Sequence, residues 1–436
     1  MTSRPCPYAR RRTRVAVLVD LVRTDNAGGH VKCWERFAQV AASMDADAVA
    51  LDLTVYFLGA REGTEVLAPH VRFVTLRPVF GSGPFTRLVG GVDATDFSPY
   101  HPALARLLDR HDVWHATHMF ALSATAARLA GRRGHRGRHG LVASVHTDVP
   151  ALTQAYAGLG ARRLQAAGSV RGGARRTQWI AGAATALMRH RRDRLLKACD
   201  RVMVSTTTEL AEFRALLGDR VSLLGRGTDH SLFLPDPGAR AELRRHGVPD
   251  GHTAVLFVGR VDASKQVMLL AEGVRRARES GHPVHLVVAG TGADTRRIEQ
   301  LLGGGVTLLG SVPQRALARV YAGCDVFAFP SHTETAGNVV AEAMACGLPV
   351  VLPAGARTTA WLPADGTCGL LVGKPEPAAW ARALTWLARY PETCRAMGRR
   401  AAAVARAEHR GWDRVLADDL LPVWHAAAPH VSSGGL

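Results

Sequence analysis

Two glutamates with seven residues between them, Glu334 and Glu342, are spaced in a way that could bind a charged ligand. Glu334 falls in a polar loop between a strand expected at 326–330 and a helix expected at 337–346. The N–H groups at the start of such a helix, together with its macrodipole, attract an anion. If a ligand's phosphate were held there, Glu334 would lie near one end of the ligand and Glu342 near the other. The spacing fits a sugar joined to a nucleoside through a diphosphate, although such a pair also occurs in α/β proteins without this function.

Two basic residues, Arg260 and Lys265, follow another expected strand at 255–259. Arginine offers a planar fork of donors and lysine a mobile point charge, and the combination suits a diphosphate. Chance exposure in a basic protein would explain either residue alone. It does not explain why both precede the two glutamates in this order.

A glycine pair, Gly28 and Gly29, lies between a strand expected at 14–20 and a helix that begins after His30. Strand, glycine pair and helix in succession let backbone amides approach a phosphate closely. An ordinary turn is an equally good interpretation. The segment is not the GxGxxG pattern of dinucleotide-binding proteins.

Histidines gather where two expected strands of the first half end. His115 and His118 belong to the segment WHATH, and His146 begins the segment HTD. A single histidine is usually structural, but two groups at equivalent strand ends favour a ligand site. Asp148, in the same HTD segment, is a candidate for acceptor contact.

Apolar strands alternate with helical stretches along most of the chain, which predicts an α/β protein with parallel, doubly wound sheets. Ligands in such sheets lie beyond the carboxyl ends of the strands. Polar residues 236–252, rich in glycine, proline and charge, read as a linker, and the last helices are expected at about 376–407 and 411–426. The strands of the first half are expected at 14–20, 52–58, 71–76, 112–116, 141–146, 201–205 and 221–224, and those of the second at 255–259, 285–290, 306–310, 326–330, 349–353 and 369–373.

The sequence SxxExxGNVVxEAMAxGLPVV at 331–351 closely resembles the retaining glycosyltransferases of family 4, which have the GT-B fold. GRVDASKQ at 259–266 and GRGTDHSLFLP at 225–235 are similar to further motifs of that family. The resemblance implies two Rossmann-like domains facing a central cleft: an acceptor domain at 13–228 and a nucleotide-sugar domain at 253–408. A crossover helix at 409–428 would pack on the first domain.

The resemblance also implies roles for individual residues. Glu334 would contact the donor sugar and Glu342 the ribose, while Arg260 and Lys265 would neutralise the diphosphate and His146 would reach the transferred sugar. His118 and Asp148 are the acceptor candidates. The remaining donor-binding candidates offer backbone groups: Gly28, Gly29, Gly310, Ser311, Gly337, Asn338 and Val339.

No cofactor and no metal are expected, because the nucleotide-sugar is a substrate and Arg260 and Lys265 would carry the charge of its diphosphate. The D-x-D sequence Asp45-Ala46-Asp47 precedes a strand instead of following one, and it reads as surface. No dedicated general base is assigned, since in the family the leaving phosphate is thought to take the acceptor's proton.

The composition is that of a globular protein of 436 residues with a formal charge of +18. Such a charge favours anionic partners, but no nucleic-acid motif accompanies it. The seven cysteines are scattered, which indicates a reducing compartment, and no run of 18 apolar residues occurs. A basic stretch at 161–197 could be a helix lying on an anionic membrane or an ordinary solvated helix. The expected location is the cytoplasm, in solution or peripheral on the inner face of the cell membrane.

Two other functions remain open from the sequence. A nucleotide-sugar epimerase of the same architecture would convert the donor without an acceptor. A non-enzymatic protein that binds membranes or nucleic acid would keep only the fold. The donor base and the acceptor, whether lipid, glycolipid or small molecule, are not determined by the residues.

Overall fold

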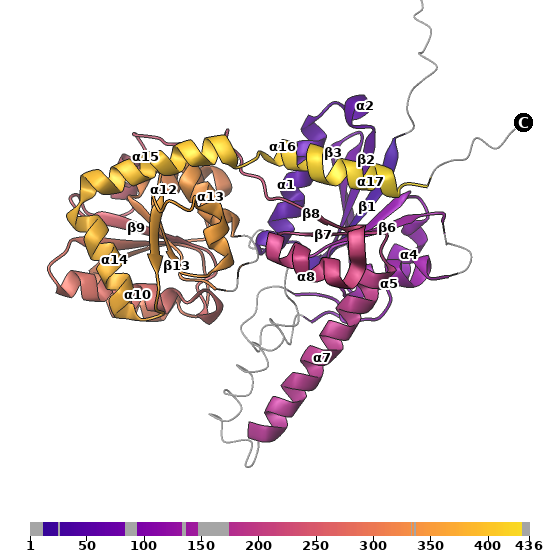
Figure 1. Ribbon diagram of the computed structural model, residues 1–436, viewed down its shortest axis with the longest axis horizontal. Helices are drawn as coiled ribbons and strands as arrows, with labels where there is room; N and C mark the ends of the chain where they lie inside the picture. Colours follow the sequence, from indigo (N-terminus) through magenta and orange to yellow (C-terminus); the bar gives the residue numbers. More distant parts are fainter. Residues whose placement is uncertain are drawn as a thin grey trace, which may run out of the picture. The chain divides into compact units, whose positions relative to one another are not determined.

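A computed structural model describes residues 12–24, 27–82, 94–132, 137–146, 174–332, 334 and 337–429. The chain divides into two compact units. Unit 1 comprises Met1–Gly225 together with Trp412–Leu436, and unit 2 comprises Arg226–Gly411. Figure 1 shows a strand-and-helix core in each of them.

Within the described residues, unit 1 contains an eight-stranded sheet in the order β3-β4-β2-β1-β5-β6-β7-β8. Its strands pair in parallel except β3, which runs antiparallel to β4 at the edge. Strand β3 was not expected, because most of its residues are exposed and show no apolar alternation. The bounds are β1 Thr13–Val22, β2 Leu51–Leu58, β3 Gly63–Ala68, β4 Val71–Leu76, β5 Val113–Ala116, β6 Gly140–Ser144, β7 Arg201–Val204 and β8 Val221–Leu223.

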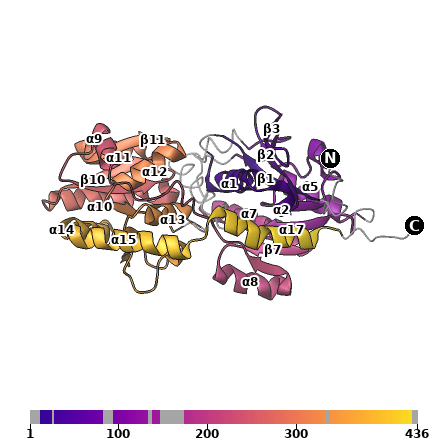
Figure 2. The ribbon, with the colours of Figure 1, turned by 90° about the horizontal axis from the view of Figure 1, so that it is seen from above.

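Helices cover both faces of this sheet. Alternate residues of β1 enter different cores: Val17 packs with Trp34 and Trp424 on one face, and Leu18 packs with Leu122 on the other. The final helical segment belongs to the first core, and Figure 2 shows α17 beside the strands of unit 1. The helices are α1 Gly29–Ser43, α2 Ala46–Val49, α4 Pro102–Leu108, α5 Ala121–Ala130, α7 Ala174–Ala198, α8 Thr207–Leu217, α16 Trp412–Val415, a π-helical turn Leu416–Leu420 and α17 Leu421–Ala427.

Unit 2 contains, among its described residues, a six-stranded parallel sheet in the order β11-β10-β9-β12-β13-β14. This doubly wound order confirms the predicted fold of the second half. The strands are β9 Thr253–Val258, β10 Val284–Ala289, β11 Val306–Gly310, β12 Val326–Ala328, β13 Val350–Pro353 and β14 Gly369–Val372. The helices are α9 Arg240–Arg245, α10 Val267–Glu279, α11 Thr295–Leu302, α12 Gln314–Gly323, α13 Asn338–Ala345, α14 Pro377–Arg389 and α15 Pro391–Glu408.

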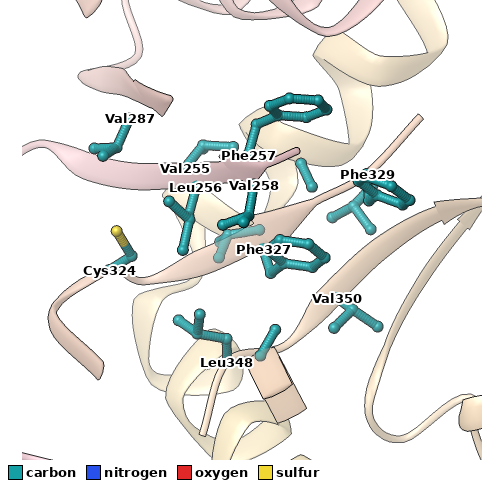
Figure 3. Packing of buried hydrophobic residues seen from close by; sticks show 14 of the residues in the cluster. Val255, Leu256, Phe257, Val258, Val287, Cys324, Phe327, Phe329, Leu348 and Val350 are labelled. Atoms are coloured by element: carbon teal, nitrogen blue, oxygen red, sulfur yellow. The ribbon is translucent and has the colours of Figure 1, made fainter. Parts of the chain in front are cut away.

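The central strands of unit 2 carry a group of buried aromatic rings (Figure 3). The rings of Phe257 and Phe329 stack with centroids 5.8 Å apart, and those of Phe327 and Phe329 with centroids 5.9 Å apart. Burying one such side chain contributes about 1.5–3 kcal/mol. Phe329 directly precedes the loop that contains Glu334, so the loop starts from a rigid, close-packed position.

Two expectations about unit 2 were wrong. Residues 236–252 are not a linker: they contain α9, and Leu243 and Val248 are buried in the unit's core. The polar residues of this stretch are partly or fully exposed to solvent. The helix expected at 376–407 is two helices, because Pro391 cannot donate the backbone hydrogen bond that would continue α14 and instead begins α15.

Close contact between two chain segments makes Gly290, after β10, irreplaceable. Its φ is +145°, and an added Cβ would lie 1.8 Å from the carbonyl oxygen of Gly259. We expect Gly290→Ala to lower the free energy of unfolding by about 3 kcal/mol or more, measured by urea denaturation. The control is Gly304→Ala, where an added Cβ meets no atom within 4 Å. Equal stability of the two variants would contradict this expectation.

Candidate functional site

Lys265 and Glu334, which are 69 positions apart in the sequence, form an ion pair in unit 2. Lys265 ends a short 3₁₀ helix, Ala263–Lys265, that follows β9, and Glu334 lies in the loop between β12 and α13. The Lys265 Nζ donates a hydrogen bond to Glu334 Oε1. The two side chains are only 14% and 24% exposed, so solvent screens this pair less than a surface pair. The fold therefore brings together two of the predicted catalytic residues.

Arg260 lies in the same loop as Lys265 and is held by its neighbours. Its Nη2 donates to Ser264 Oγ at 3.3 Å, and its Nε lies 3.5 Å from Asp262 Oδ2. Asp262 in turn caps the 3₁₀ helix by accepting from the Ser264 N–H at 2.9 Å. The guanidinium is thus oriented by a carboxylate and a hydroxyl, which reduces its freedom to adopt other rotamers.

Gly337 leads the chain into α13. It has a φ of +63°, and an added Cβ would lie 2.4 Å from Thr358 Cγ2, so glycine is required there. The same Cβ position is 3.7 Å from the Cβ of Glu334. The helix N-terminus, with the backbone amides of Asn338 and Val339, therefore begins beside Glu334. Residues 335 and 336 lie outside the described residues.

Glu342 lies one helical turn after Asn338 on α13, so the two share a face of that helix. The Tyr321 hydroxyl, from α12, donates to Glu342 Oε2 at 3.2 Å. Burial and the neighbouring Glu342 carboxylate raise the pKa of Tyr321 well above its usual value, so the phenol keeps its proton. This contact was not predicted from the residues, because a tyrosine in an apolar helix reads as core.

Gly310 ends β11, at the edge of the same sheet, and Ser311 follows it. Gly310 has a φ of +65°, and its carbonyl already accepts the Gly290 N–H at 2.7 Å. Ser311 is exposed. The turn is open to solvent, and its predicted contact with the nucleotide base stays a prediction.

Unit 1 gathers three histidines near the start of α1. The ring centroid of His30 lies 4.4 Å from that of His118 and 4.5 Å from that of His146. Burial lowers the pKa of His118 to about 4, so its ring is neutral near pH 7. His30 was missed as a candidate, and its position next to the glycine pair was the only available signal. Asp148 lies outside the described residues.

The glycine pair begins α1. Gly28 is the N-cap residue, with an extended backbone, and Gly29 is the first helical residue. An added Cβ at Gly29 would meet no atom within 4 Å. Local sterics therefore do not require glycine at Gly29, and the predicted approach of a phosphate stays a prediction.

His115, in the WHATH segment, contributes its ring to the core of unit 1 instead of to a ligand site. It lies within β5, and its side chain is completely buried. Its Nε2 is 2.8 Å from Ser144 Oγ, and its Nδ1 accepts the indole N–H of Trp424 at 3.0 Å. Burial lowers the pKa of His115 to about 3.

The D-x-D sequence has a structural role. Asp45 caps α2 by accepting the N–H groups of Asp47 and Ala48. Asp47 is 87% exposed and pairs with Arg12 at 2.7 Å. The prediction that these carboxylates belong to the surface is confirmed. Across the described residues, no three histidine, cysteine or acidic side chains are grouped so as to hold a metal ion.

The basic stretch at 161–197 is described only from residue 174, where α7 begins. Figure 1 shows α7 as a long helix extending from the rest of unit 1. It exposes Trp179 by 75% and Leu187 by 54% among its arginines. Among the described helices, none combines the length and apolarity needed to cross a membrane.

Two doubly wound units, one with a lysine–glutamate pair beside a helix N-terminus, place the chain in the α/β class. Residues 252–389 match the family model described as Glycosyl transferases group 1. The matched segment lies within unit 2.

Two solved structures have a similar fold. The fold is similar to sucrose-phosphate synthase of Thermosynechococcus elongatus, with a TM-score of 0.68, 20% identity, and coverage of 95% of this chain and 100% of that one. It is also similar to Anabaena Alr3699/HepE in complex with UDP-glucose, with a TM-score of 0.65, 15% identity, and coverage of 95% and 100%. The fold is GT-B.

A D-inositol 3-phosphate glycosyltransferase of Thermomonospora curvata is 34% identical over 265 residues, which are 55% of this chain and 60% of the relative. The chain thus spans less than two thirds of the length of this curated relative.

Proposed function

We propose that this protein is a retaining glycosyltransferase that moves a sugar from a nucleotide-diphosphate donor, UDP- or GDP-linked, to a hydroxyl acceptor. The observation that carries the proposal is the Lys265–Glu334 ion pair beside the N-terminus of α13. The pair lies within the segment that matches the glycosyltransferase family model.

The ion pair resolves an electrostatic difficulty of such a site. A carboxylate that contacts the donor sugar would repel the diphosphate attached to that sugar, unless a cation neutralises the carboxylate. Lys265 does this through one of its three N–H donors. The other two would be available to oxygens of the diphosphate, so the lysine can serve the carboxylate and the ligand together.

The slow step of the proposed reaction is departure of the nucleoside diphosphate, as negative charge builds on its bridging oxygen. Lys265, Arg260 and the first amides of α13 would stabilise this charge. Preorganised donors of this kind contribute about 3–4 kcal/mol each. Glu334 would hold the sugar and favour the positive charge that develops at its anomeric carbon, and a phosphate oxygen of the leaving group would take the acceptor's proton. Glu342, on the face of α13 shared with Asn338, would bind the ribose.

The acceptor proposal is broader. The curated relative's name supports testing D-inositol 3-phosphate first. The exposed Trp179 and Leu187 on the arginine-rich α7 support a lipid acceptor and a peripheral position on an anionic membrane. Gly28, Gly29, His118 and His146 in unit 1 are proposed to serve the substrates, and no metal is proposed.

The test of function uses the purified full chain. Thermal stabilisation by UDP, GDP and other nucleoside diphosphates would select the donor base. Incubation of the matching nucleotide-sugar with D-inositol 3-phosphate, or with vesicles containing phosphatidylinositol, should then give a new glycoside whose NMR coupling constant reports retention. Conversion of the donor without any acceptor would instead indicate an epimerase, and absence of nucleotide binding would overturn the proposal.

The Tyr321–Glu342 contact gives a prediction about donor affinity. We expect Tyr321→Phe to weaken binding of the nucleoside diphosphate about fivefold, because a hydrogen bond to a carboxylate contributes about 1 kcal/mol and Glu342 loses its orientation. Isothermal titration measures the affinity. Tyr390→Phe, in an exposed tyrosine of the same unit, is the control and should bind as the wild type does. Unchanged affinity in Tyr321→Phe would show that the contact is only structural.

A further inference from the structure

A chain of polar contacts runs through the otherwise apolar core of unit 1 and ends at His146. It begins at Trp424, on α17. The Trp424 indole N–H donates to His115 Nδ1 at 3.0 Å, His115 Nε2 lies 2.8 Å from Ser144 Oγ, and Ser144 Oγ lies 2.6 Å from His146 Nε2. The four residues are at most 4% exposed. Solvent therefore takes little part in satisfying these atoms.

The indole of Trp424 determines the donor and acceptor at each step of this hydrogen-bond chain. An indole N–H can only donate, so His115 Nδ1 must accept and carries no proton. The proton of neutral His115 is then on Nε2, which donates to Ser144 Oγ. The Ser144 hydroxyl has one proton of its own, and the remaining neighbour in the chain is His146 Nε2. That nitrogen accepts it, so the proton of neutral His146 is on Nδ1.

We propose that Trp424, His115 and Ser144 are positioning residues that hold His146 in the tautomer with its proton on Nδ1. Within the described residues, the His146 ring also packs against His30 and Trp34 of α1, whose ring centroids lie 4.5 Å and 5.6 Å away. Packing against them restricts the plane of the ring, and the hydrogen-bond chain determines which nitrogen donates. Such control of a histidine tautomer by a second partner is common in functional sites.

The tautomer itself does not depend on the proposed function. Its consequence does: His146 would meet the sugar with a fixed N–H donor. The segment after β6, where His146 lies, would then depend on a side chain 278 positions later in the sequence. The last helix would contribute to the site through Trp424 as well as to the core.

The test measures the tautomer directly. In a long-range ¹H–¹⁵N spectrum at pH 7.5, the signals of His146 are those missing from His146→Gln. In the wild type they should show a protonated Nδ1 and an unprotonated Nε2. Ser144→Ala should shift them toward a mixture of both tautomers, and Trp424→Phe should do so through His115. The control is Ser205→Ala, which removes a hydroxyl after the neighbouring strand β7 that donates to Val145 O at 3.4 Å; it should leave the signals unchanged.

A kinetic measurement distinguishes this inference from the proposed function. With an active donor and acceptor, Ser144→Ala should lower kcat about tenfold with little change in the donor KM, as expected for a misoriented donor group, while Ser205→Ala keeps full activity. Wild-type signals for His146 in both Ser144→Ala and Trp424→Phe would overturn the inference, whether or not the enzyme is active. An altered tautomer with unchanged kcat would instead overturn the role of His146 in transfer.

Discussion

Glu334→Gln is expected to lower kcat for sugar transfer by about 10²–10³-fold, with little change in the folded structure. The amide keeps the size of the side chain but removes the charge that would favour the developing cation at the anomeric carbon. It also leaves Lys265 without its ionic partner. The free lysine charge should bind a nucleoside diphosphate at least as tightly as in the wild type. A large fall in kcat with unchanged or tighter product binding is therefore the expected signature.

A matched ion pair in the same unit provides the control. Glu242 pairs with Arg319, and its side chain is 23% exposed, close to the 24% of Glu334. Glu242→Gln should cost a similar small amount of stability, about 1 kcal/mol or less, and retain full activity. Steady-state kinetics and thermal unfolding of both variants decide the matter. A Glu334→Gln enzyme with wild-type kcat would remove Glu334 from the proposed mechanism.

The second large effect is a loss of stability in mild acid. Burial lowers the pKa of His115 to about 3 and those of His111 and His118 to about 4. The folded protein therefore binds fewer protons on these rings than the unfolded chain does between about pH 6.5 and pH 4. Stability from this source is present above pH 6.5 and is lost as the pH falls below it. At pH 5 each ring costs about 2 kcal/mol relative to pH 7.

Buried Asp20 acts in the opposite direction. Burial raises the pKa of its carboxyl to about 6, although its oxygens accept the N–H groups of Leu122 and Ser123 at the start of α5. It binds more protons in the folded state, so its contribution to stability falls as the pH rises. Between pH 5 and pH 7 this amounts to about 1 kcal/mol. The three histidines outweigh it, and unit 1 should be about 5 kcal/mol less stable at pH 5 than at pH 7.

Hydrogen exchange of peptides from β5 and β6, across a urea series at each pH, would follow unit 1 separately from unit 2. His111→Gln should reduce the difference between pH 7 and pH 5 by about 2 kcal/mol. The exposed His190 on α7 serves as the control, and His190→Gln should leave the difference unchanged. Equal stability of the wild type at both pH values would contradict this expectation.

The sequence alone was informative wherever short-range rules apply. Apolar runs closed by glycine or proline located every strand of unit 2, because a parallel strand buried on both faces must be apolar along its length. Gly337 has a φ of +63° and lies too close to Thr358 for a side chain, which explains why this position is a glycine. The residues 236–252 were misread because they bury few side chains, Leu243 of α9 and Val248 after it among them, and their composition is otherwise that of a linker.

Contacts between distant segments were decided only by the tertiary structure. The order of Lys265 and Glu334 in the sequence suggested a common ligand, but their direct ion pair depends on the β9–β12 pairing that brings their two loops together. The partner of Glu342 is a tyrosine from another helix, and the partner of His115 is Trp424, 309 positions away. Residue types and local spacing determined the kinds of groups present and the strands that carry them. Which groups meet was decided by the packing of the sheets and helices, since a hydrogen bond depends on distance and angle and not on separation along the chain.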